Sequence, residues 1–131
     1  LGSGAGFPGL ILALFNNNID FHVKLFEKSP VKRAFLRHIS DRLSLKIEIL
    51  GNVYESSIST DYIVCRAFKK LDAIIQVSRE IAQKSHKLII LKGQNAQKDL
   101  EKAFKKEKYD YKLENSLTKE DSKIIIVDFK K

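Results

Sequence analysis

Three glycines at alternate positions open the sequence and are suited to holding a ligand against bare backbone. Gly2, Gly4 and Gly6 precede Phe7 and an apolar run over residues 10–15. Glycine adopts positive φ readily and lets a ligand approach the main chain where a Cβ would clash. Loops of this kind before a helix bind nucleotides, but G-x-G-x-G differs from the G-x-G-x-x-G dinucleotide fingerprint. Because Phe7 occupies space that a dinucleotide needs, the pattern argues against that ligand.

A carboxylate follows the glycines at the distance typical of a ribose ligand. Glu27 ends a strand-like run over residues 22–27, about twenty residues beyond the loop. Carboxylates at this position of nucleotide-binding sheets accept hydrogen bonds from ribose hydroxyls. The alternative is a solvated charge at the end of a strand. The spacing to the loop favours the ribose ligand.

Two cations stand where later apolar runs end. Arg66 follows the run over residues 62–65, and Lys92 follows the run over residues 87–91. A guanidinium at the mouth of an apolar strand is well shaped to grip a carboxylate or phosphate. A salt bridge to Glu27, Glu55 or Asp61 explains Arg66 equally well. Lys92 could steer a polyanion, or it could be a solvated residue at the end of a strand.

The histidines and the cysteine form no recognisable catalytic or metal-binding constellation. His22, His38 and His86 lack metal-ligand spacing, so packing or surface roles are expected and no metal is assigned. Cys65, the single cysteine, has no partner for an internal disulfide. A cysteine inside a strand is more often core packing than a covalent nucleophile.

The charge balance favours a polyanionic partner. The 131 residues include 24 Lys and Arg against 16 Asp and Glu, a formal charge of +8 with a pI near 9.6. One basic cluster follows Glu27 directly, and phosphate contacts there would orient an RNA without reading its sequence. The lysines over residues 98–108 are expected to be a solvated helix face. The candidate RNA-binding residues are Lys28, Lys32, Arg33, Arg37, Lys69 and Lys92.

Hydrophobic periodicity predicts which elements position these residues. Ser29 and Pro30 predict a helix start, with the Ser29 hydroxyl as N-cap and the proline in the first turn. From there Val31, Phe35, Ile39 and Leu43 recur every four residues, which predicts one buried stripe. Further helices are expected over 9–15, 71–82 and 96–106, and strands over 22–27, 46–50, 62–66, 87–91, 109–113 and 123–129.

Alternating strands and helices predict an α/β fold with parallel crossovers. The connection between the last two strands is too short for a crossover helix, so these strands should form an antiparallel hairpin. A dinucleotide-binding sheet of the NAD type would usually continue with parallel strands instead. The length and a hydrophobic content of 44% suit a single domain over residues 1–131.

Four blocks of sequence resemble the RsmG (GidB) family of bacterial 16S rRNA guanine-N7 methyltransferases. In chain order they are residues 2–10 (GSGAGFPGL), 32–37 (KRAFLR), 65–68 (CRAF) and 91–93 (LKG). The resemblance covers effectively the whole chain and implies a Rossmann-like class I methyltransferase sheet that uses S-adenosylmethionine. It also implies 16S rRNA or the small ribosomal subunit as partner. The cofactor-binding residues it implies are Gly2, Gly4, Gly6, Phe7, Glu27, Tyr54, Glu55 and Arg66.

Two departures from the family pattern accompany this resemblance. Members normally have a complete first strand ending in Asp before the position of Leu1, with a helical segment ahead of it, so we expect an N-terminally truncated methyltransferase domain whose first strand is missing. Cys65 stands where members commonly have Ser. We expect a monomeric cytoplasmic protein without a membrane segment. An oxidoreductase on a similar sheet and a non-enzymatic basic RNA-binding domain remain as alternatives, and the truncated copy could be inactive.

Overall fold

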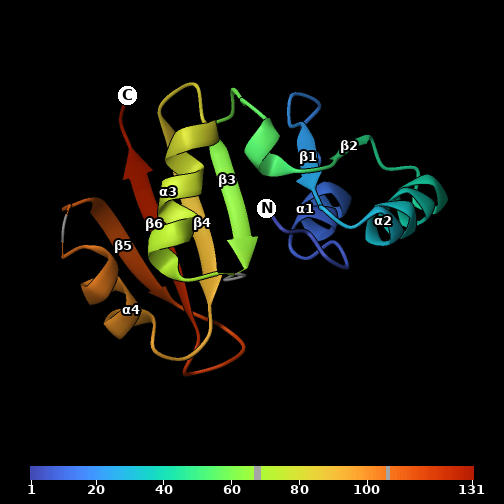
Figure 1. Cartoon of the computed structure of the whole chain (residues 1–131). Helices are drawn as coiled ribbons and strands as arrows, with labels where there is room; N and C mark the ends of the chain where they lie inside the picture. Colours follow the sequence, from blue (N-terminus) through green and yellow to red (C-terminus); the bar gives the residue numbers. More distant parts are fainter. Residues whose placement is uncertain (67–68, 106) are drawn as a thin grey trace. The chain divides into compact units, whose positions relative to one another are not determined.

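Helices and strands alternate along the chain, as the periodicity predicts (Figure 1). The computed structural model describes residues 1–66, 69–105 and 107–131. Ala67 and Phe68 of the third family-like block, and Lys106 at the end of a predicted helix, lie outside the described residues. The chain divides into two compact units, Leu1–Ser56 and Ser57–Lys131, and each is described by itself. The single methyltransferase domain over residues 1–131 stays a prediction.

The first unit is built on a short parallel sheet. Strands β1 and β2 pair in register from Val23 with Ile47 to Phe26 with Leu50, and helix α2 makes the crossover between them. A small apolar core forms around Leu10, which comes from α1. The elements are α1 (Gly9–Phe15), β1 (Val23–Phe26), α2 (Pro30–Arg42), β2 (Ile47–Leu50) and the 3₁₀ turn η1 (Val53–Glu55).

Helix α2 begins as predicted but turns a different face to the core. The Ser29 hydroxyl accepts a hydrogen bond from the Lys32 N–H at 3.4 Å, which confirms the N-cap. Leu36 is fully buried, whereas Val31 is 79% exposed and Phe35 49% exposed. The predicted buried stripe is therefore wrong for Val31, Phe35 and Leu43, whereas Ile39 packs against the core as predicted. The apolar residues at this spacing outnumber those that a two-stranded sheet can cover.

The second unit is a four-stranded mixed sheet in the order β3-β4-β6-β5. Strand β3 pairs with β4 in parallel, and β6 pairs antiparallel with both β4 and β5. The predicted terminal hairpin is thus confirmed. The elements are β3 (Tyr62–Arg66), α3 (Leu71–Ile81), β4 (His86–Lys92), α4 (Ala96–Ala103), β5 (Asp110–Asn115) and β6 (Lys123–Phe129).

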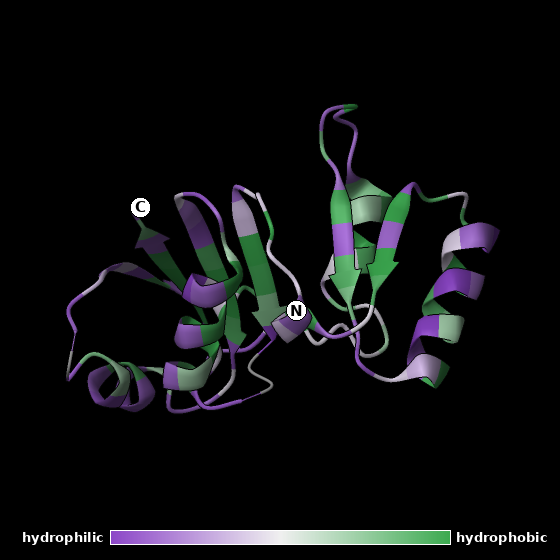
Figure 2. Ribbon diagram, turned by 45° about the horizontal axis from the view of Figure 1, so that its top comes forward, coloured by the Kyte–Doolittle hydropathy of each residue, from purple (hydrophilic) through white to green (hydrophobic). Residues whose placement is uncertain are grey.

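Apolar strands make the core of this second sheet (Figure 2). Cys65, Leu88, Ile90, Ile125 and Val127 are completely buried. Helix α3 turns an apolar face toward them, since its apolar residues at helical spacing are buried while its charged residues face solvent. No helix in the described part of the chain is long and apolar enough to cross a membrane.

Strands β1 and β3 are two of the four edge strands in the described sheets. Among the described residues, β1 pairs with β2 alone and β3 pairs with β4 alone, so each has one side without a strand neighbour. The Ser3 N–H donates to the Phe26 carbonyl at 3.0 Å, which aligns the start of the chain with the outer edge of β1. The expected missing first strand stays a prediction.

Candidate cofactor site at the glycine loop

The glycine loop has the backbone conformation that its sequence predicts. Gly2, Gly4 and Gly6 have φ values of 59°, 53° and 98°, all in the region that favours glycine. The turn closes through the Gly6 N–H, which donates to the Ser3 carbonyl at 2.7 Å, and the Leu10 N–H then donates to the Gly6 carbonyl at 2.6 Å. The loop therefore leads directly into α1.

Glu27 connects this loop to the end of β1. Its Oε2 accepts a hydrogen bond from the Gly4 N–H at 2.7 Å, and its Oε1 accepts one from the Ser29 N–H at 2.9 Å. The residue is only 8% exposed. One carboxylate thus fixes both the loop before α1 and the turn before α2.

The surroundings of Glu27 favour its charged form. Burial raises the pKa of this carboxyl, but hydrogen bonds from the Ser29 and Gly4 N–H groups and the positive charges of Lys32 and Arg33 outweigh burial. The net pKa lies below its ordinary value. A carboxylate oxygen has two lone pairs, so each oxygen can still accept a further hydrogen bond, such as one from a hydroxyl.

Two glycines allow close packing behind the loop, and a third leaves open space. A Cβ on Gly6 would lie 2.2 Å from Leu10 Cδ1, and one on Gly9 would lie 2.2 Å from Leu25 Cδ2. At Gly4 the nearest atom to a Cβ would be the Gly2 carbonyl oxygen at 3.9 Å. Gly6 and Gly9 are therefore packing glycines, whereas Gly4 borders a space beside the main chain.

The other predicted cofactor residues of the first unit lie on its surface. The side chain of Phe7 is half exposed, and so is that of Tyr54 in η1. The Asn52 side chain accepts from the Tyr54 N–H at 3.2 Å and donates to Glu55 Oε1 at 2.8 Å. Asn52, which no sequence motif singled out, thus positions both predicted residues.

Arg33 has a structural role beside the predicted one. Its Nη1 donates to the carbonyl of Glu27 at 2.9 Å and to the carbonyl of Lys28 at 2.7 Å. The guanidinium therefore stabilises the turn after β1, and its contact with RNA stays a prediction.

The remaining basic residues of this cluster are accessible. Lys28, Lys32 and Arg37 are exposed. Among the residues that the structure describes, none of these three forms an ion pair. Their charges are thus open to a polyanion.

Three predicted residues belong to the second unit. Arg66 is exposed at the end of β3, and Asp61, one of its predicted alternative partners, pairs with Lys84 at 2.7 Å. Lys92 pairs with Asp99 of α4 at 2.8 Å, so its charge is already compensated. Lys69 is exposed just before α3.

The cysteine and the histidines add no catalytic group to the loop. Burial raises the pKa of the Cys65 thiol to about 11, which disfavours the thiolate. His22 and His38 are exposed, and His86 is buried at the start of β4. Within residues 1–66, 69–105 and 107–131 there is no group of three potential metal ligands.

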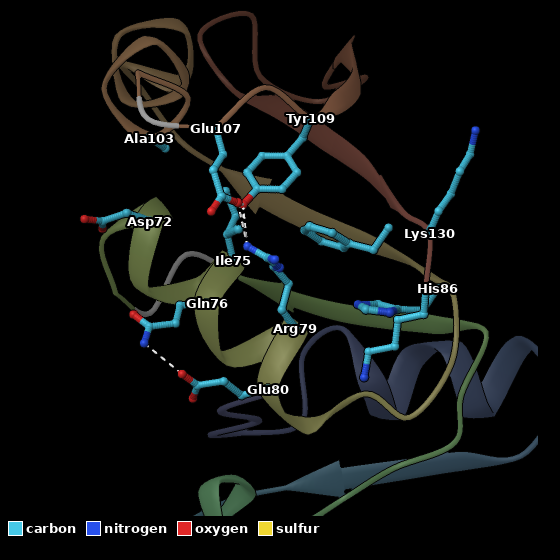
Figure 3. Close-up of a pocket in the computed structure, with 12 residues that line it drawn as sticks. Asp72, Ile75, Gln76, Arg79, Glu80, His86, Ala103, Glu107, Tyr109 and Lys130 are labelled. Carbon is cyan, nitrogen blue, oxygen red and sulfur yellow. Dashed lines mark hydrogen bonds and ion pairs between the residues drawn. The ribbon is translucent and has the colours of Figure 1, made fainter.

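A cavity of about 670 Å³ lies in the second unit, and none of the described residues that line it is a predicted site residue (Figure 3). Helix α3 contributes one wall through Ile75 and Arg79, while His86, Tyr109 and Phe129 contribute aromatic surface. The His86 and Phe129 rings stack at 5.1 Å between centroids. No sequence motif indicated this cavity, because its lining comes from separate elements.

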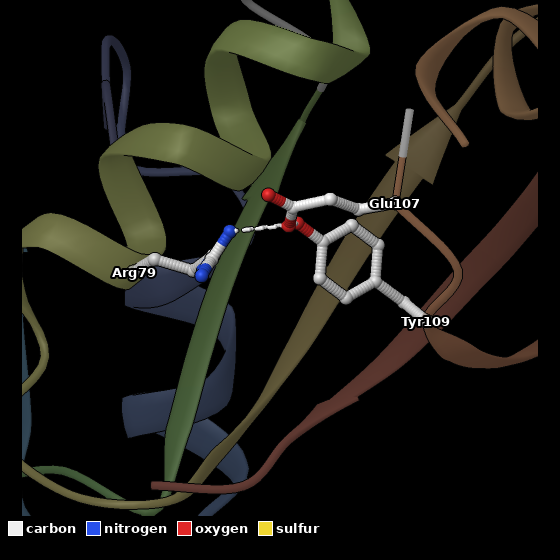
Figure 4. A network of polar contacts seen from close by, with 3 residues as sticks. All are labelled: Arg79, Glu107 and Tyr109. Atoms are coloured by element: carbon white, nitrogen blue, oxygen red, sulfur yellow. Dashed lines mark hydrogen bonds and ion pairs between the residues drawn. The ribbon is translucent and has the colours of Figure 1, made fainter. Parts of the chain in front are cut away.

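A polar network closes one side of this cavity (Figure 4). Arg79 Nη1 donates to Glu107 Oε2 at 2.6 Å and to the Tyr109 hydroxyl at 2.8 Å, and the Tyr109 hydroxyl donates to Glu107. The hydrogen bond from Tyr109 and the charge of Arg79 lower the pKa of Glu107. The network connects α3 to the segment before β5, and within it the positive charge of Arg79 is paired with the negative charge of Glu107.

Solved structures with the same fold are methyltransferases. A SAM-dependent methyltransferase from Aquifex aeolicus aligns with a TM-score of 0.73 at 12% identity, covering 97% of this chain and 78% of that one. A methyltransferase from Pyrococcus furiosus also gives 0.73, at 11% identity, covering 99% of this chain and 73% of that one. The chain therefore has the α/β fold of SAM-dependent methyltransferases.

Sequence comparison then identifies the family. The model of the GidB family, rRNA small subunit methyltransferase G, matches residues 1–125. The ribosomal RNA small subunit methyltransferase G of Pelagibacter ubique is 34% identical over 126 residues, and that of Orientia tsutsugamushi strain Ikeda is 33% identical over 126 residues. These alignments cover 93% and 95% of this chain, and 59% and 62% of those proteins. The chain belongs to this family and spans about three-fifths of the length of these relatives.

Proposed function

We propose that the chain is the cofactor-binding part of an S-adenosylmethionine-dependent methyltransferase that modifies guanine N7 in 16S rRNA. The observation that carries the proposal is the bond from the Gly4 N–H to Glu27, because it holds a glycine loop and a ribose-type carboxylate in one arrangement. Membership of the family agrees with this function. An oxidoreductase is disfavoured, since the G-x-G-x-G loop departs from the dinucleotide fingerprint.

The residues of the loop fit this cofactor. The open space beside Gly4 and the positive φ angles at all three glycines suit the methionine part of the cofactor against bare backbone. Glu27 retains lone pairs for the ribose hydroxyls, and Tyr54 with Glu55 would border the adenine. Arg66, which belongs to the second unit, stays a predicted cofactor residue.

The chemistry requires positioning and no general base. S-adenosylmethionine supplies an electrophilic methyl group, and guanine N7 carries a lone pair without a proton. The residues of this chain would align the acceptor with the methyl group and exclude water, which is a contribution of proximity and orientation. Among the described residues, no His–Asp or Cys–His pair lies at the loop, and the task of positioning needs none.

The RNA would approach over the start of α2. Lys28, Lys32 and Arg37 present charges on the segment after Glu27 that form no ion pair among the described residues, and Lys69 stays a predicted RNA contact. Removing one lysine that binds a phosphate should lower the slope of log affinity against log salt by about one. We assign Arg33 to the turn and Lys92 to its ion pair with Asp99, so neither is expected to contribute to this slope.

Binding of S-adenosylhomocysteine tests the proposal. Calorimetric titration of the chain with this compound should give saturable binding, and a parallel titration with NADH should give none. Binding of NADH alone would instead support an oxidoreductase. Binding of neither, together with salt-dependent RNA binding, would support a non-enzymatic RNA-binding domain.

Three finer features belong to the proposal. The chain would act as a monomer in the cytoplasm on the rRNA of the small ribosomal subunit. Residues 1–131 would form one methyltransferase domain once a strand ahead of Leu1 completes the sheet. The Ser3–Phe26 hydrogen bond supports that strand, because it already aligns the chain with the edge of β1.

A further inference from the structure

The solvent face of α2 carries a row of side chains able to stack on planar groups. Val31, Phe35, His38 and Arg42 follow one another at spacings of four, three and four residues, so they lie on one side of the helix. All four are exposed. We name this row the α2 stripe. It faces away from Leu36, which is fully buried.

Nothing in the described part of the first unit occupies the α2 stripe. The side chains of Phe35, His38 and Arg42 make no hydrogen bond and no ring contact with another described residue. An exposed phenylalanine followed by an imidazole and a guanidinium is an unusual use of a helix surface, because apolar side chains normally face the core.

The charge around the α2 stripe indicates what it would bind. Between residues 28 and 46 the chain has six Lys or Arg residues and a single carboxylate, Asp41. Lys32 lies beside Phe35 on the helix and is exposed. An acidic groove or a phosphate backbone would be attracted to this surface, whereas a neutral apolar partner would leave the cations unpaired.

We propose that the α2 stripe is a stacking platform for unpaired bases of the RNA substrate, with Phe35 as its central residue and Lys32 on the adjoining phosphate. Single-stranded RNA is recognised by stacking on Phe, His and Arg planes, combined with cations that follow the backbone. The α2 stripe presents all three stacking types in sequence. Duplex RNA has its bases inside and offers no face to such a row. This inference rests on the proposed RNA substrate and specifies that its contacted part is single-stranded.

Alanine substitution separates stacking from charge. Phe35→Ala should lower affinity for a single-stranded RNA oligonucleotide roughly 5- to 100-fold and leave the salt slope unchanged. Lys32→Gln should lower the slope of log affinity against log salt by about 0.7 instead. Phe15→Ala is the matched control, since Phe15 is 76% exposed at the end of α1, a helix without charged residues. It should bind RNA as the parent does.

A fluorescent variant reports stacking directly. The chain has no tryptophan, so Phe35→Trp places the single indole on the α2 stripe. Its emission should be quenched by the single-stranded oligonucleotide and stay unchanged with a duplex of the same sequence. Phe15→Trp should respond to neither.

Several outcomes would overturn the proposal. Parent-like RNA affinity of Phe35→Ala, or equal quenching by duplex and single strand, would remove the stacking role. Indole emission from Phe35→Trp that shifts to the blue with protein concentration and ignores RNA would assign the α2 stripe to protein contact. The S-adenosylhomocysteine titration, repeated on each variant, separates this inference from the proposed function. A variant that binds the cofactor normally and also binds RNA as the parent does would refute the stacking platform and leave the proposed function standing.

Discussion

The Glu27 carboxylate accepts the Gly4 N–H at 2.7 Å, so a residue at the end of β1 holds the loop that opens the chain. The two residues are separated by 23 positions in sequence. This bond makes the shape of the loop depend on a charged side chain, and the expected consequences can be measured.

Glu27→Gln should weaken both the fold and cofactor binding. Gly4 and Ser29 bind different oxygens of the carboxylate, and Gln replaces one of these oxygens by an NH2 donor, so one hydrogen bond is lost and we expect the unfolding free energy to fall by about 1.5–3 kcal/mol. Affinity for S-adenosylhomocysteine should fall at least about tenfold. Urea unfolding and calorimetry check these changes. Glu48→Gln on β2, an exposed partner of Lys24, is the control and should alter neither quantity appreciably.

The same carboxylate predicts acid sensitivity. The pKa of Glu27 is lower in the folded chain than its ordinary 4.5, so its stabilisation is complete above that value and is lost as pH falls through the folded-state pKa. Unfolding free energy measured from pH 6 downward should decline less in Glu27→Gln than in the parent. An identical decline in both would exclude Glu27 as a contributor.

Two alanine substitutions should distinguish packing from cofactor access. Gly6→Ala places a Cβ against Leu10 at positive φ, so we expect a loss of about 2–4 kcal/mol in unfolding free energy. Gly4→Ala meets open space and should lose only about 1–2 kcal/mol, from backbone strain alone. Its Cβ would project into the proposed cofactor space, so S-adenosylhomocysteine affinity should fall in a variant that remains folded. Unimpaired binding by Gly4→Ala would place the cofactor elsewhere.

His86 should make the second unit less stable in mild acid. Its Nδ1–H donates to the Lys84 carbonyl at 3.1 Å, so in the neutral ring its Nε2 accepts a hydrogen bond from the buried Ser78 hydroxyl at 2.7 Å. Burial, with a smaller effect from the charge of Lys131, lowers its pKa below the ordinary 6.5. Just below pH 6.5 the unfolded chain therefore binds a proton at this histidine that the folded chain does not bind. The unfolding free energy should fall as pH drops below 6.5.

The pH slope identifies the residue responsible. Chemical unfolding between about pH 7.5 and about pH 5.5, one unit to either side of the ordinary histidine pKa, should show the decline in the parent and in His38→Gln. His38 is exposed and serves as the control. His86→Gln should flatten the decline, whatever its effect on absolute stability. An unchanged slope would assign the effect to other groups.

Tyr109 should stabilise the second unit through its ring more than through its hydroxyl. The ring contacts Phe104 and Phe129 at 5.3 Å between centroids, whereas the Arg79–Glu107 pair that its hydroxyl joins is half exposed. Tyr109→Phe should therefore cost at most about 1 kcal/mol, and Tyr109→Ala about 2–4 kcal/mol. Denaturant unfolding of both variants checks the difference, and equal losses would mean that the polar network dominates.

A preceding strand should stabilise the first unit. The relatives are longer than this chain, and the Ser3 N–H already pairs with the Phe26 carbonyl at the edge of β1. Fusing the corresponding segment of the Pelagibacter ubique relative before Leu1 should raise the unfolding free energy and sharpen the transition. A scrambled segment of equal composition is the control. Equal stability of both fusions would argue against the strand.

Local rules made much of the fold predictable from sequence. The Ser29 N-cap depends on a hydroxyl three residues from an N–H, and the hairpin of β5 and β6 depends on a connection too short for a helix. The glycine loop was equally predictable from sequence, because positive φ at three nearby positions favours glycine. Glu27 could be selected by its spacing to that loop.

Tertiary structure decided which side chains were left for binding. Spacing alone placed Val31 and Phe35 in the core, but the narrow sheet of β1 and β2 covers one side of α2, where Leu36 is buried, and leaves the α2 stripe in solvent. Arg33 and Lys92 were predicted to bind RNA as Lys32 was, and only the folded chain shows that Arg33 donates to two carbonyls and that Lys92 pairs with Asp99. Periodicity fixes the spacing of residues along a helix, whereas burial and charge pairing depend on what packs against it, and that contact joins segments far apart in sequence.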